Sequence, residues 1–439
     1  MRPTQPRRVA ITGIGVVSPL GQSSATLWDN LSAGHSGVRP LEALAAFVGE
    51  TRFGAPAAEF TGHIDEFGEL AKDQKKLIRK GTKLMCRETM MGVAASQRAL
   101  QDAGLAMGDY DPERTGCVFG SDYMLTMPED FVDGAKQCVD DKGDFAYEQW
   151  GSQGLPRVSP LWLLFYLPNM PASHVAIYND LRGPSNSLTQ REAASNLAVG
   201  EAAQIIGRGT ADVMVAGATG TRLHPMNMLH ALQHEEVAGN HVAPAEASRP
   251  FDRDRTGMVL GEGSGAVILE ELEAARARGA RIYGEVVGVG SSSVTRAPSI
   301  ADRRRAIANA LAAALRQASL ARNEVGHVHA HGLATRACDA DEAAAIATVF
   351  GDRGGQPPVV AAKSHLGNLG AGGGMIELAA SLLAQQQGRL FRVLNYETPD
   401  EACDVNVVRH DEAAAGKSFV NINVTPQGQA SVLAVRAAE

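Results

Sequence analysis

Short apolar runs alternate with longer amphipathic segments along the whole chain. Residues 8–17 (RVAITGIGVV), 211–217 (ADVMVAG) and 264–270 (SGAVILE) have the nearly continuous apolar character of buried strands. Residues 83–104 carry apolar positions at helical spacing and end at a glycine, and 193–208 read as an Ala-rich helix. This alternation predicts a layered α/β protein.

A second series with the same alternation begins near residue 282. Its predicted strands are 282–290, 325–330, 358–362 and 419–424, and its predicted helices are 303–321 and 374–387. The change from one series to the other near 270–280 divides the chain into two similar halves, residues 1–275 and 276–439. The least regular stretch, about 120–165, is predicted to be an insertion that covers a site or an interface.

Composition narrows the class of protein. Hydrophobic residues make up 44% of the chain and charged residues 21%, as in ordinary globular proteins, and the net charge of −8 argues against general binding to nucleic acid or membrane surfaces. No apolar run approaches the roughly 20 residues of a spanning helix, and we expect no secretory signal. The cysteines are scattered and odd in number, which predicts a reducing, cytoplasmic compartment: Cys86, Cys117, Cys138, Cys338 and Cys403.

Five segments resemble the β-ketoacyl-(acyl-carrier-protein) synthase family, in particular its type II-like members. They are VAITGIGVVSPLG (9–21), LPNMPASHVAIYNDLRGP (167–184), SRPFDRDRTGMVLGEGSGAVILE (248–270), AHGLATRACDADE (330–342) and AAKSHLGNLGAGGG (361–374). The third is the most specific, because its Phe-Asp…Gly-Glu-Gly string is rare elsewhere. The resemblance implies a thiolase fold, in which two βαβ-type halves form a five-layered αβαβα sandwich that is usually dimeric.

The resemblance also implies a reaction. Family members hold an acyl chain as a thioester on a cysteine at a helix N-terminus, where the dipole and free N–H groups favour the thiolate and bind an oxyanion. Two histidines then stabilise the enolate formed when a malonyl thioester loses CO₂. The implied partner is an acyl carrier protein. Beyond its phosphopantetheine arm, the resemblance implies no metal and no organic cofactor.

The family's cysteine lies nine residues after the glycine of a Gly-Pro turn. That turn is Gly183-Pro184 here, and the ninth position is Glu192. No cysteine lies between Cys138 and Cys338, so we predict that the nucleophile is absent. We expect Glu192 to occupy the space of the cysteine and to cap nearby N–H groups at the helix N-terminus, where its charge gains roughly 0.3–1 kcal/mol.

The remaining catalytic positions are partly retained. His331 matches the first histidine, with Asp339 and Glu342 at the family's spacing behind it, and Lys363 matches the lysine motif. Asn368 stands where the second histidine belongs, five residues after the lysine. The family's C-terminal Phe-Gly-Phe-Gly-Gly loop, which gates the acyl pocket, is replaced by NVTPQGQAS (423–431). The predicted degenerate site therefore consists of Glu192, His331, Lys363, Asn368 and Glu342.

Three functions fit this pattern. The first is a non-condensing subunit of fatty-acid or polyketide biosynthesis, similar to a chain length factor and paired with a cysteine-bearing ketosynthase; such subunits usually carry glutamine where this chain has Glu192. The second is a decarboxylase that turns malonyl-carrier protein into an acetyl primer, with Asn368 donating one hydrogen bond, although an anionic Glu192 opposes the enolate charge. The third is a homodimer that binds acyl-carrier protein without turnover.

Basic side chains gather before and within the predicted helix 83–104. They are Lys72, Lys75, Lys76, Arg79, Lys80, Lys83 and Arg87. Acyl carrier proteins are acidic, so this cluster is a candidate docking surface, and the alternative is a merely solvated helix face.

Three histidines alternate at positions 327, 329 and 331. On a strand, they project from one face, and such spacing can bind zinc. A buried parallel strand more commonly packs its histidines in hydrogen bonds, so we expect no metal site here.

Overall fold

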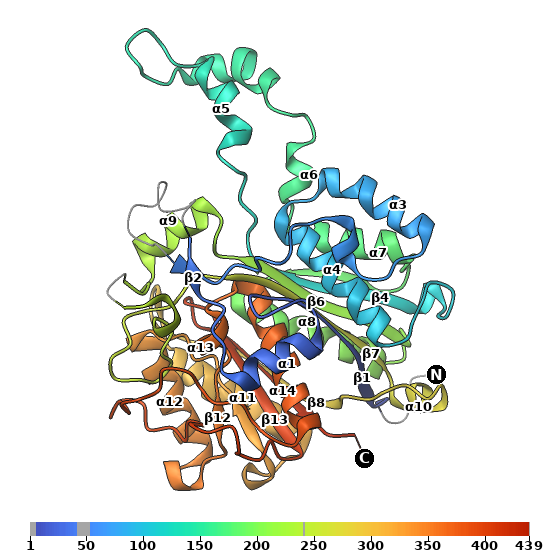
Figure 1. The fold of residues 1–439 in the computed structure, drawn as a ribbon, viewed down its shortest axis with the longest axis vertical. Coiled ribbons are helices and arrows are strands. Elements are labelled where there is room, and N and C mark those ends of the chain that lie inside the picture. The colour runs from blue at the N-terminus through green and yellow to red at the C-terminus, as the bar shows by residue number, and fades with distance from the viewer. Residues whose placement is uncertain (1–5, 42–52, 240–241, 439) are drawn as a thin grey trace.

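One ten-stranded sheet runs through the residues described by the computed structural model, which are 6–41, 53–239 and 242–438 (Figure 1). Its strand order is β12-β11-β13-β14-β8-β1-β7-β6-β4-β5. One half of it contains β1 (Val9–Val17), β4 (Thr115–Ser121), β5 (Ser185–Thr189), β6 (Val213–Thr221) and β7 (Glu262–Glu271). The other contains β8 (Gly284–Ser293), β11 (His327–His329), β12 (Val359–Val360), β13 (Ser418–Val424) and β14 (Gln429–Arg436).

The two halves of the sheet have the same topology. In the first half, β4 is parallel to β5 and β6, whereas β7 is antiparallel to β6 and β1. In the second half, β11 is parallel to β12 and β13, whereas β14 is antiparallel to β13 and β8. The halves join where β1 and β8 pair antiparallel, with Ala10 opposite Glu285 and Ile11 opposite Gly284.

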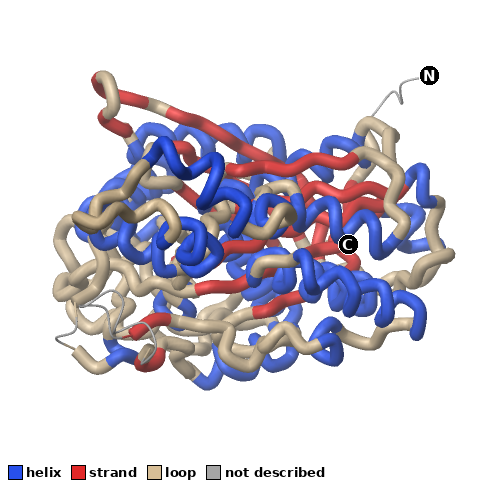
Figure 2. The backbone as a smooth tube through the Cα atoms, turned by 90° about the horizontal axis from the view of Figure 1, so that it is seen from above, coloured by secondary structure: helices blue, strands red, loops and turns tan. Residues whose placement is uncertain are grey.

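Helices pack on both faces of each half, so that strands run between helical layers (Figure 2). The longer ones are α1 (Ser24–Ala33), α3 (Lys72–Gly81), α4 (Arg87–Asp102), α7 (Met170–Asn179), α8 (Ala194–Gly207), α9 (Pro225–His234), α11 (Arg303–Ala318), α12 (Arg336–Phe350) and α14 (Gly373–Gln387). The shorter ones are α5 (Glu129–Lys136), α6 (Trp162–Tyr166), α10 (Leu272–Ala277) and α13 (Lys363–Leu366). No described helix is long and apolar enough to cross a membrane.

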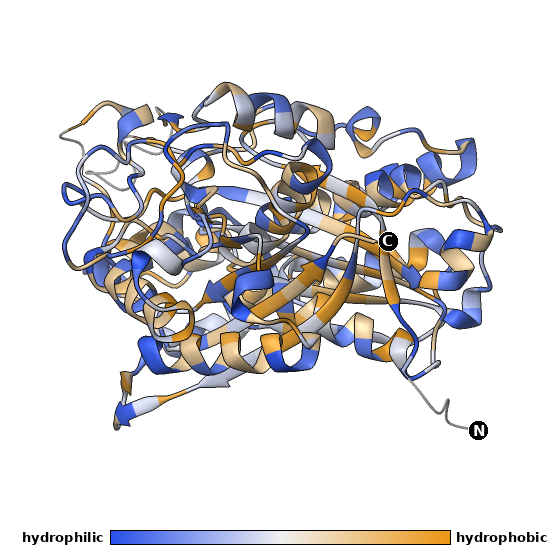
Figure 3. Cartoon of the chain, turned by 90° about the horizontal axis from the view of Figure 1, so that it is seen from below, coloured by the Kyte–Doolittle hydropathy of each residue, from blue (hydrophilic) through white to orange (hydrophobic). Residues whose placement is uncertain are grey.

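The alternation of side chains along the strands separates the layers. Met214 and Ala216 on β6 pack in the cluster that contains α8 and α14, whereas Val215 packs with α4 and α7 on the other face. Helices α8 and α14 contact strands of both halves and form the middle layer, and α11 and α12 cover the outer face of the second half. The predicted thiolase fold, a five-layered αβαβα sandwich, is thereby confirmed, and its strands are mainly apolar (Figure 3).

Some predicted boundaries differ from the structure. The helix expected over 83–104 begins at Arg87, because Thr82–Leu84 is a separate 3₁₀ turn and Met85 is extended. The edge strand β5 was missed, since its sequence SNSLT is polar and mostly exposed. The stretch expected to be an insertion leaves the body as a long excursion that contains α5 and α6 (Figure 1). Residues 122–167 are called the arm below.

Candidate active site

Glu192 lies at the point where β5 turns into the middle-layer helix α8. The turn Arg191–Ala193 is a 3₁₀ segment that leads directly into Ala194. Arg191 has a φ of 48°, in the left-handed region that non-glycine residues rarely occupy, so the chain turns sharply there. Glu192 is only 2% exposed. The residue at the predicted nucleophile position is therefore buried at the head of α8.

The Glu192 carboxylate is ion-paired with Arg222, a residue that follows β6 and is completely buried. The Arg222 guanidinium also lies 3.2 Å from Glu235 and 3.9 Å from Asp122. Arg191 donates to the same Glu235 carboxylate at 2.8 Å. Three carboxylates and two guanidinium groups thus form one network around the head of α8, in which Glu192, Arg222 and Asp122 are buried and Arg191 and Glu235 are partly exposed. It is called the Glu192 network below.

Charge neighbours decide the protonation of this network. Burial by itself would raise the pKa of Glu192, but Arg222 and Arg191 outweigh it and hold that pKa well below its usual range. Burial raises the pKa of Asp122, and Arg222 offsets this only in part. Burial would likewise lower the pKa of Arg222, but the carboxylates around it raise it instead. Glu192 is therefore a permanent anion matched to a permanent cation.

The Glu192 carboxylate was predicted to cap backbone N–H groups, but its hydrogen bonds come from side chains. Its Oε1 atom accepts hydrogen bonds from Arg222 and from the Nδ2 group of Asn368, the latter at 3.2 Å. Arginines supply the stabilisation because a buried guanidinium carries a full charge, whereas a helix terminus offers only about half a charge. The Oδ1 atom of Asn368 accepts from the Gly370 N–H at 3.0 Å, which fixes the amide with its hydrogens toward Glu192.

His331 and Lys363 lie together on the other side of the site. The Lys363 ammonium group is ion-paired with Glu377 and lies 3.3 Å from Nδ1 of His331. Asn423 donates to the second oxygen of Glu377 at 2.6 Å. The Nε2 atom of His331 is buried and has no hydrogen-bond partner among the described residues. Burial and the nearby Lys363 charge both lower the pKa of His331, so its imidazole is neutral.

Glu342 supports the loop of His331 from behind. Its two oxygens accept the backbone N–H groups of His331 and Gly332 at 2.6 and 2.8 Å. Burial raises the pKa of this carboxyl to about 8. Glu342 therefore positions the histidine through the backbone, and the structure places its carboxyl on the loop rather than on the imidazole ring.

The other two alternating histidines form a separate buried network. His327 Nε2 and His329 Nδ1 both contact the Ser381 hydroxyl, at 3.1 and 2.7 Å. His329 Nε2 accepts the Ala362 N–H at 3.2 Å, and the Ala415 carbonyl lies 2.7 Å from His327 Nδ1. Each of these nitrogens has a protein partner. Within the described ranges, no group of three histidine, cysteine or acidic residues could hold a metal ion.

The sequence predicted residues on both sides of the site but not the charged side chains that pair with them. Glu192 touches Asn368, and His331 lies beside Lys363, as the motifs suggested. The missed residues are Asp122, Arg222, Glu235 and Glu377. A signal did exist for Arg222, since a lone arginine directly after the apolar strand β6 requires a buried partner.

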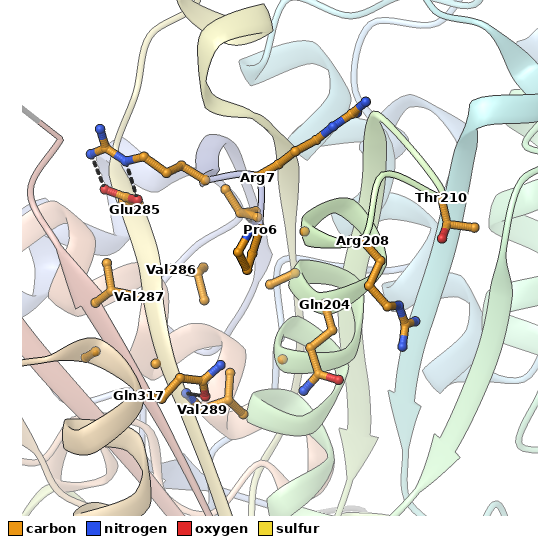
Figure 4. A pocket seen from close by; sticks show the side chains of 17 residues that line it. Pro6, Arg7, Gln204, Arg208, Thr210, Glu285, Val286, Val287, Val289 and Gln317 are labelled. Carbon is orange, nitrogen blue, oxygen red and sulfur yellow. Dashed lines mark hydrogen bonds and ion pairs between the residues drawn. The ribbon is translucent and has the colours of Figure 1, made fainter. Parts of the chain in front are cut away.

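A groove of about 860 Å³ lies at the far end of α8 (Figure 4). It is bounded by residues 6–9, by α8 and by β8, and Arg8 is held there by a bidentate pair with Glu285. The α8 residue of this groove nearest to Glu192 is Gly200, eight residues beyond it, which corresponds to about 12 Å along the helix. The groove is therefore not part of the candidate site.

Comparison with known proteins places this geometry in a family. The model of the β-ketoacyl synthase N-terminal domain matches residues 6–275, and that of the β-ketoacyl synthase C-terminal domain matches residues 283–397. The chain belongs to the β-ketoacyl synthase family. A 3-oxoacyl-[acyl-carrier-protein] synthase 2 of Synechocystis is 33% identical over 408 residues, which is 92% of this chain and 91% of that protein.

Solved structures of β-ketoacyl synthases agree with this assignment. The ishigamide ketosynthase/chain length factor superposes with a TM-score of 0.81 at 27% identity, over 99% of this chain and all of the other. A type II polyketide synthase acyl-carrier protein in complex with its ketosynthase bound to the hexaketide also gives 0.81, at 26% identity and with the same coverage. Within this β-ketoacyl synthase fold, the head of α8 carries a buried salt bridge.

Proposed function

We propose that this protein is a non-condensing subunit of fatty-acid or polyketide biosynthesis, similar to a chain length factor, that works with a cysteine-bearing ketosynthase. The observation that carries the proposal is the salt bridge between Glu192 and Arg222. A condensing enzyme needs a thiolate at the head of this helix to hold the acyl chain as a thioester. A carboxylate with a strongly lowered pKa is a poor acyl acceptor, and the anhydride that it would form hydrolyses readily.

Arg222 adds a steric argument to the chemical one. Its whole side chain is buried, and its guanidinium lies between Glu192, Glu235 and Asp122. Atoms and hydrogen bonds thus occupy the space beside the head of α8. An acyl chain that entered there would break a buried ion pair, which costs about 3–5 kcal/mol. The growing chain is therefore expected to lie in the partner's site.

One observation favours decarboxylation as the second candidate function. His331 keeps a buried Nε2 atom without a protein partner, as a donor aimed at a substrate oxygen would. Against this, the Nδ2 group of Asn368 is already bonded to Glu192, and the Glu192 charge opposes an enolate nearby. The paired-donor arrangement that stabilises an enolate is therefore incomplete, and we place this function second.

The basic face of α3 supports an acyl carrier protein as a partner. Lys72, Lys76, Arg79 and Lys80 are exposed along this helix, and Leu77 between them is 44% exposed. A positive surface with an apolar centre complements an acidic helix, and a related ketosynthase has been solved with its carrier protein. Two predicted members differ from this group: Arg87 is paired with Glu262 and binds two backbone carbonyls, and Lys75 is paired with Asp65.

The free edge of β5 supports pairing with a second subunit. This strand ends the sheet and bonds only to β4 among the described strands. Unpaired edges of this kind invite a strand from another chain. The nearby arm also exposes large apolar side chains, including Tyr147 at 82%, Leu161 at 50% and Leu163 at 48%. We infer that the edge and the arm bind either a cysteine-bearing ketosynthase or a second copy of this chain.

Reconstitution tests the proposal. The purified chain, a cysteine-bearing ketosynthase from the same organism and malonyl-carrier protein are combined, and the carrier-bound products are followed by intact mass. We expect elongation only when both chains are present, and product lengths that change when the arm of this chain is altered. Elongation that proceeds equally well with and without this chain would contradict the proposal. Loss of CO₂ from malonyl-carrier protein with this chain alone, abolished by His331→Ala, would establish the second candidate function instead.

A further inference from the structure

A second cavity, of about 360 Å³, lies on the opposite face of the first half of the sheet from Glu192. Two successive residues at the end of β6 show the separation. Thr221 donates to Glu262 at 3.2 Å, whereas Arg222 is paired with Glu192. None of the side chains of the Glu192 network lines the cavity, so the cavity is a separate space, although Asp122 acts electrostatically on both Glu192 and Glu88.

The cavity lies beneath the arm. Met127, where the arm leaves the body, and Tyr166, where it returns, both line it. The Tyr166 hydroxyl donates to Asp130 on α5 at 2.6 Å, so the two ends of the arm are linked there. Leu223 and Pro225, at the start of α9, add apolar wall. This volume falls within the range of small-molecule sites, and the wall combines apolar and polar groups as such sites do.

Two polar groups of the wall are buried, and one of them has an atom without a hydrogen-bond partner among the described residues. His224 is 8% exposed, and its Nδ1 atom accepts the Met226 N–H at 3.2 Å, so in the neutral ring Nε2 carries the proton. That Nε2 group has no partner among the described residues. Glu88, at 6% exposure, lies in the first turn of α4, and its carboxyl accepts hydrogen bonds from its own backbone N–H and from the Cys86 thiol. The cavity therefore presents one hydrogen-bond donor and one carboxyl group.

The charge around Glu88 is negative. The titratable and charged groups near it are Cys86 and Arg87 on the same segment, Glu262 on β7, Asp122 after β4, Tyr166 on α6 and His224 before α9. Arg87 is the only cation among them, and it is already bound to both oxygens of Glu262, at 2.6 and 2.8 Å. Burial, with smaller effects from Glu262 and Asp122, raises the pKa of Glu88 to about 7. A cation in the cavity would relieve this excess of negative charge.

We propose that this cavity binds a small amphiphilic molecule that carries an ammonium group and a hydrogen-bond acceptor on an apolar body. The ammonium group pairs with the Glu88 carboxylate, and the acceptor binds Nε2–H of His224. The apolar body packs against Met127, Leu223 and Pro225. The site uses neither Glu192 nor His331, but two residues of its wall, Met127 and Tyr166, belong to the arm that we infer to bind a second subunit.

Calorimetric titration with 6-amino-1-hexanol tests the proposal, with 1-hexanol as the probe that lacks the amine. An alkylamine titrates near 10.4, as lysine does, so this probe stays charged between pH 6 and 8. Glu88 ionises over the same interval, so binding of the amine should be about tenfold tighter at pH 8 than at pH 6. The alcohol should bind more weakly and without this dependence. Equal binding of the two probes, or no binding of the amine, would overturn the proposal.

A matched pair of variants tests whether the amine binds at Glu88. Glu88→Gln should remove the pH dependence and weaken binding of the amine at pH 8 at least tenfold; at pH 6 the native carboxyl is mainly neutral, so the amide is a close substitute. Glu412→Gln makes the same change at an exposed position in the second half, outside the cavity wall, and should bind like the native protein. If the two variants bind alike at pH 8, the site is not the Glu88 cavity.

Discussion

The salt bridge between Glu192 and Arg222 predicts a large coupling in a double-mutant cycle. Glu192→Gln leaves the buried Arg222 with Glu235 at 3.2 Å and Asp122 at 3.9 Å, so it should lose about 3 kcal/mol of stability, the lower end of the range for breaking buried pairs. Arg222→Met leaves Glu192 with the Asn368 amide at 3.2 Å and with Arg191, at 3.6 Å, as its nearest cation, and should lose about 5 kcal/mol.

The double variant distinguishes a true pair from two independent contributions. When both charges are removed, neither side chain is left buried without a partner, so the loss should not exceed that of Arg222→Met alone. The coupling free energy is then about 3 kcal/mol, against at most about 0.5 kcal/mol for independent sites. Urea unfolding at pH 7, followed by tryptophan fluorescence, measures all four proteins. Additive losses would refute the reasoning.

The pH dependence of stability provides a second test of the salt bridge between Glu192 and Arg222. The pKa of Glu192 is lowered on folding, so its stabilisation is present above the unfolded value of 4.5 and is lost as the pH falls below it. The difference between the native protein and Glu192→Gln should therefore shrink in acid. Asp180→Asn is the matched control, because it changes an exposed pair with Arg182 at 2.8 Å and should alter stability by less than about 0.5 kcal/mol.

Three further predictions follow from other parts of the molecule. The single variant Glu192→Cys should be less stable than the native protein, because Arg222 loses its main partner. It should also accept no acyl group from acyl-carrier protein, as measured by intact mass. An acylated Glu192→Cys protein would show that Arg222 does not block the site. The double variant Lys76→Glu, Arg79→Glu should bind carrier protein about tenfold more weakly, and its binding should depend less on salt. The control Lys417→Glu, outside α3, should bind like the native protein. Equal effects of the two changes would show that α3 is not the docking surface. Burial raises the pKa of Glu342 to about 8, so this carboxyl contributes stability in acid that is lost as the pH rises through that value, whereas buried histidines such as His331 act in the opposite direction. The melting temperature of the native protein should therefore fall relative to that of Glu342→Gln as the pH rises from 5 to 9, and a constant difference would contradict this value.

Much of the fold could be predicted because buried strands have a direct signature. Runs such as those of β6 and β7 are apolar on both faces, since helices cover both sides of the sheet. The polar edge strand β5 lacks this apolar pattern, so it was not predicted from the sequence. Helix α4 was extended too far because basic residues before Arg87 continue the helical periodicity through a turn that the structure breaks.

The residues of the site, like the strands, could be predicted only in part. Glu192, His331, Lys363 and Asn368 could be located because each follows a motif at fixed spacing along the chain. Their partners could not, because Arg222, Glu235 and Glu377 come from other segments, and only tertiary packing brings them into contact. The charge state of Glu192 depends on Arg222 and Arg191, so it could not be obtained from the sequence position alone.

The central claim is that the head of α8 cannot hold an acyl chain. The most direct test incubates the purified chain alone with acyl-carrier protein and malonyl-carrier protein and records the intact masses of the chain and both carriers. We predict no acyl adduct on the chain and no β-ketoacyl product on the carrier. An adduct that maps to Glu192, or elongation without an added ketosynthase, would contradict the account.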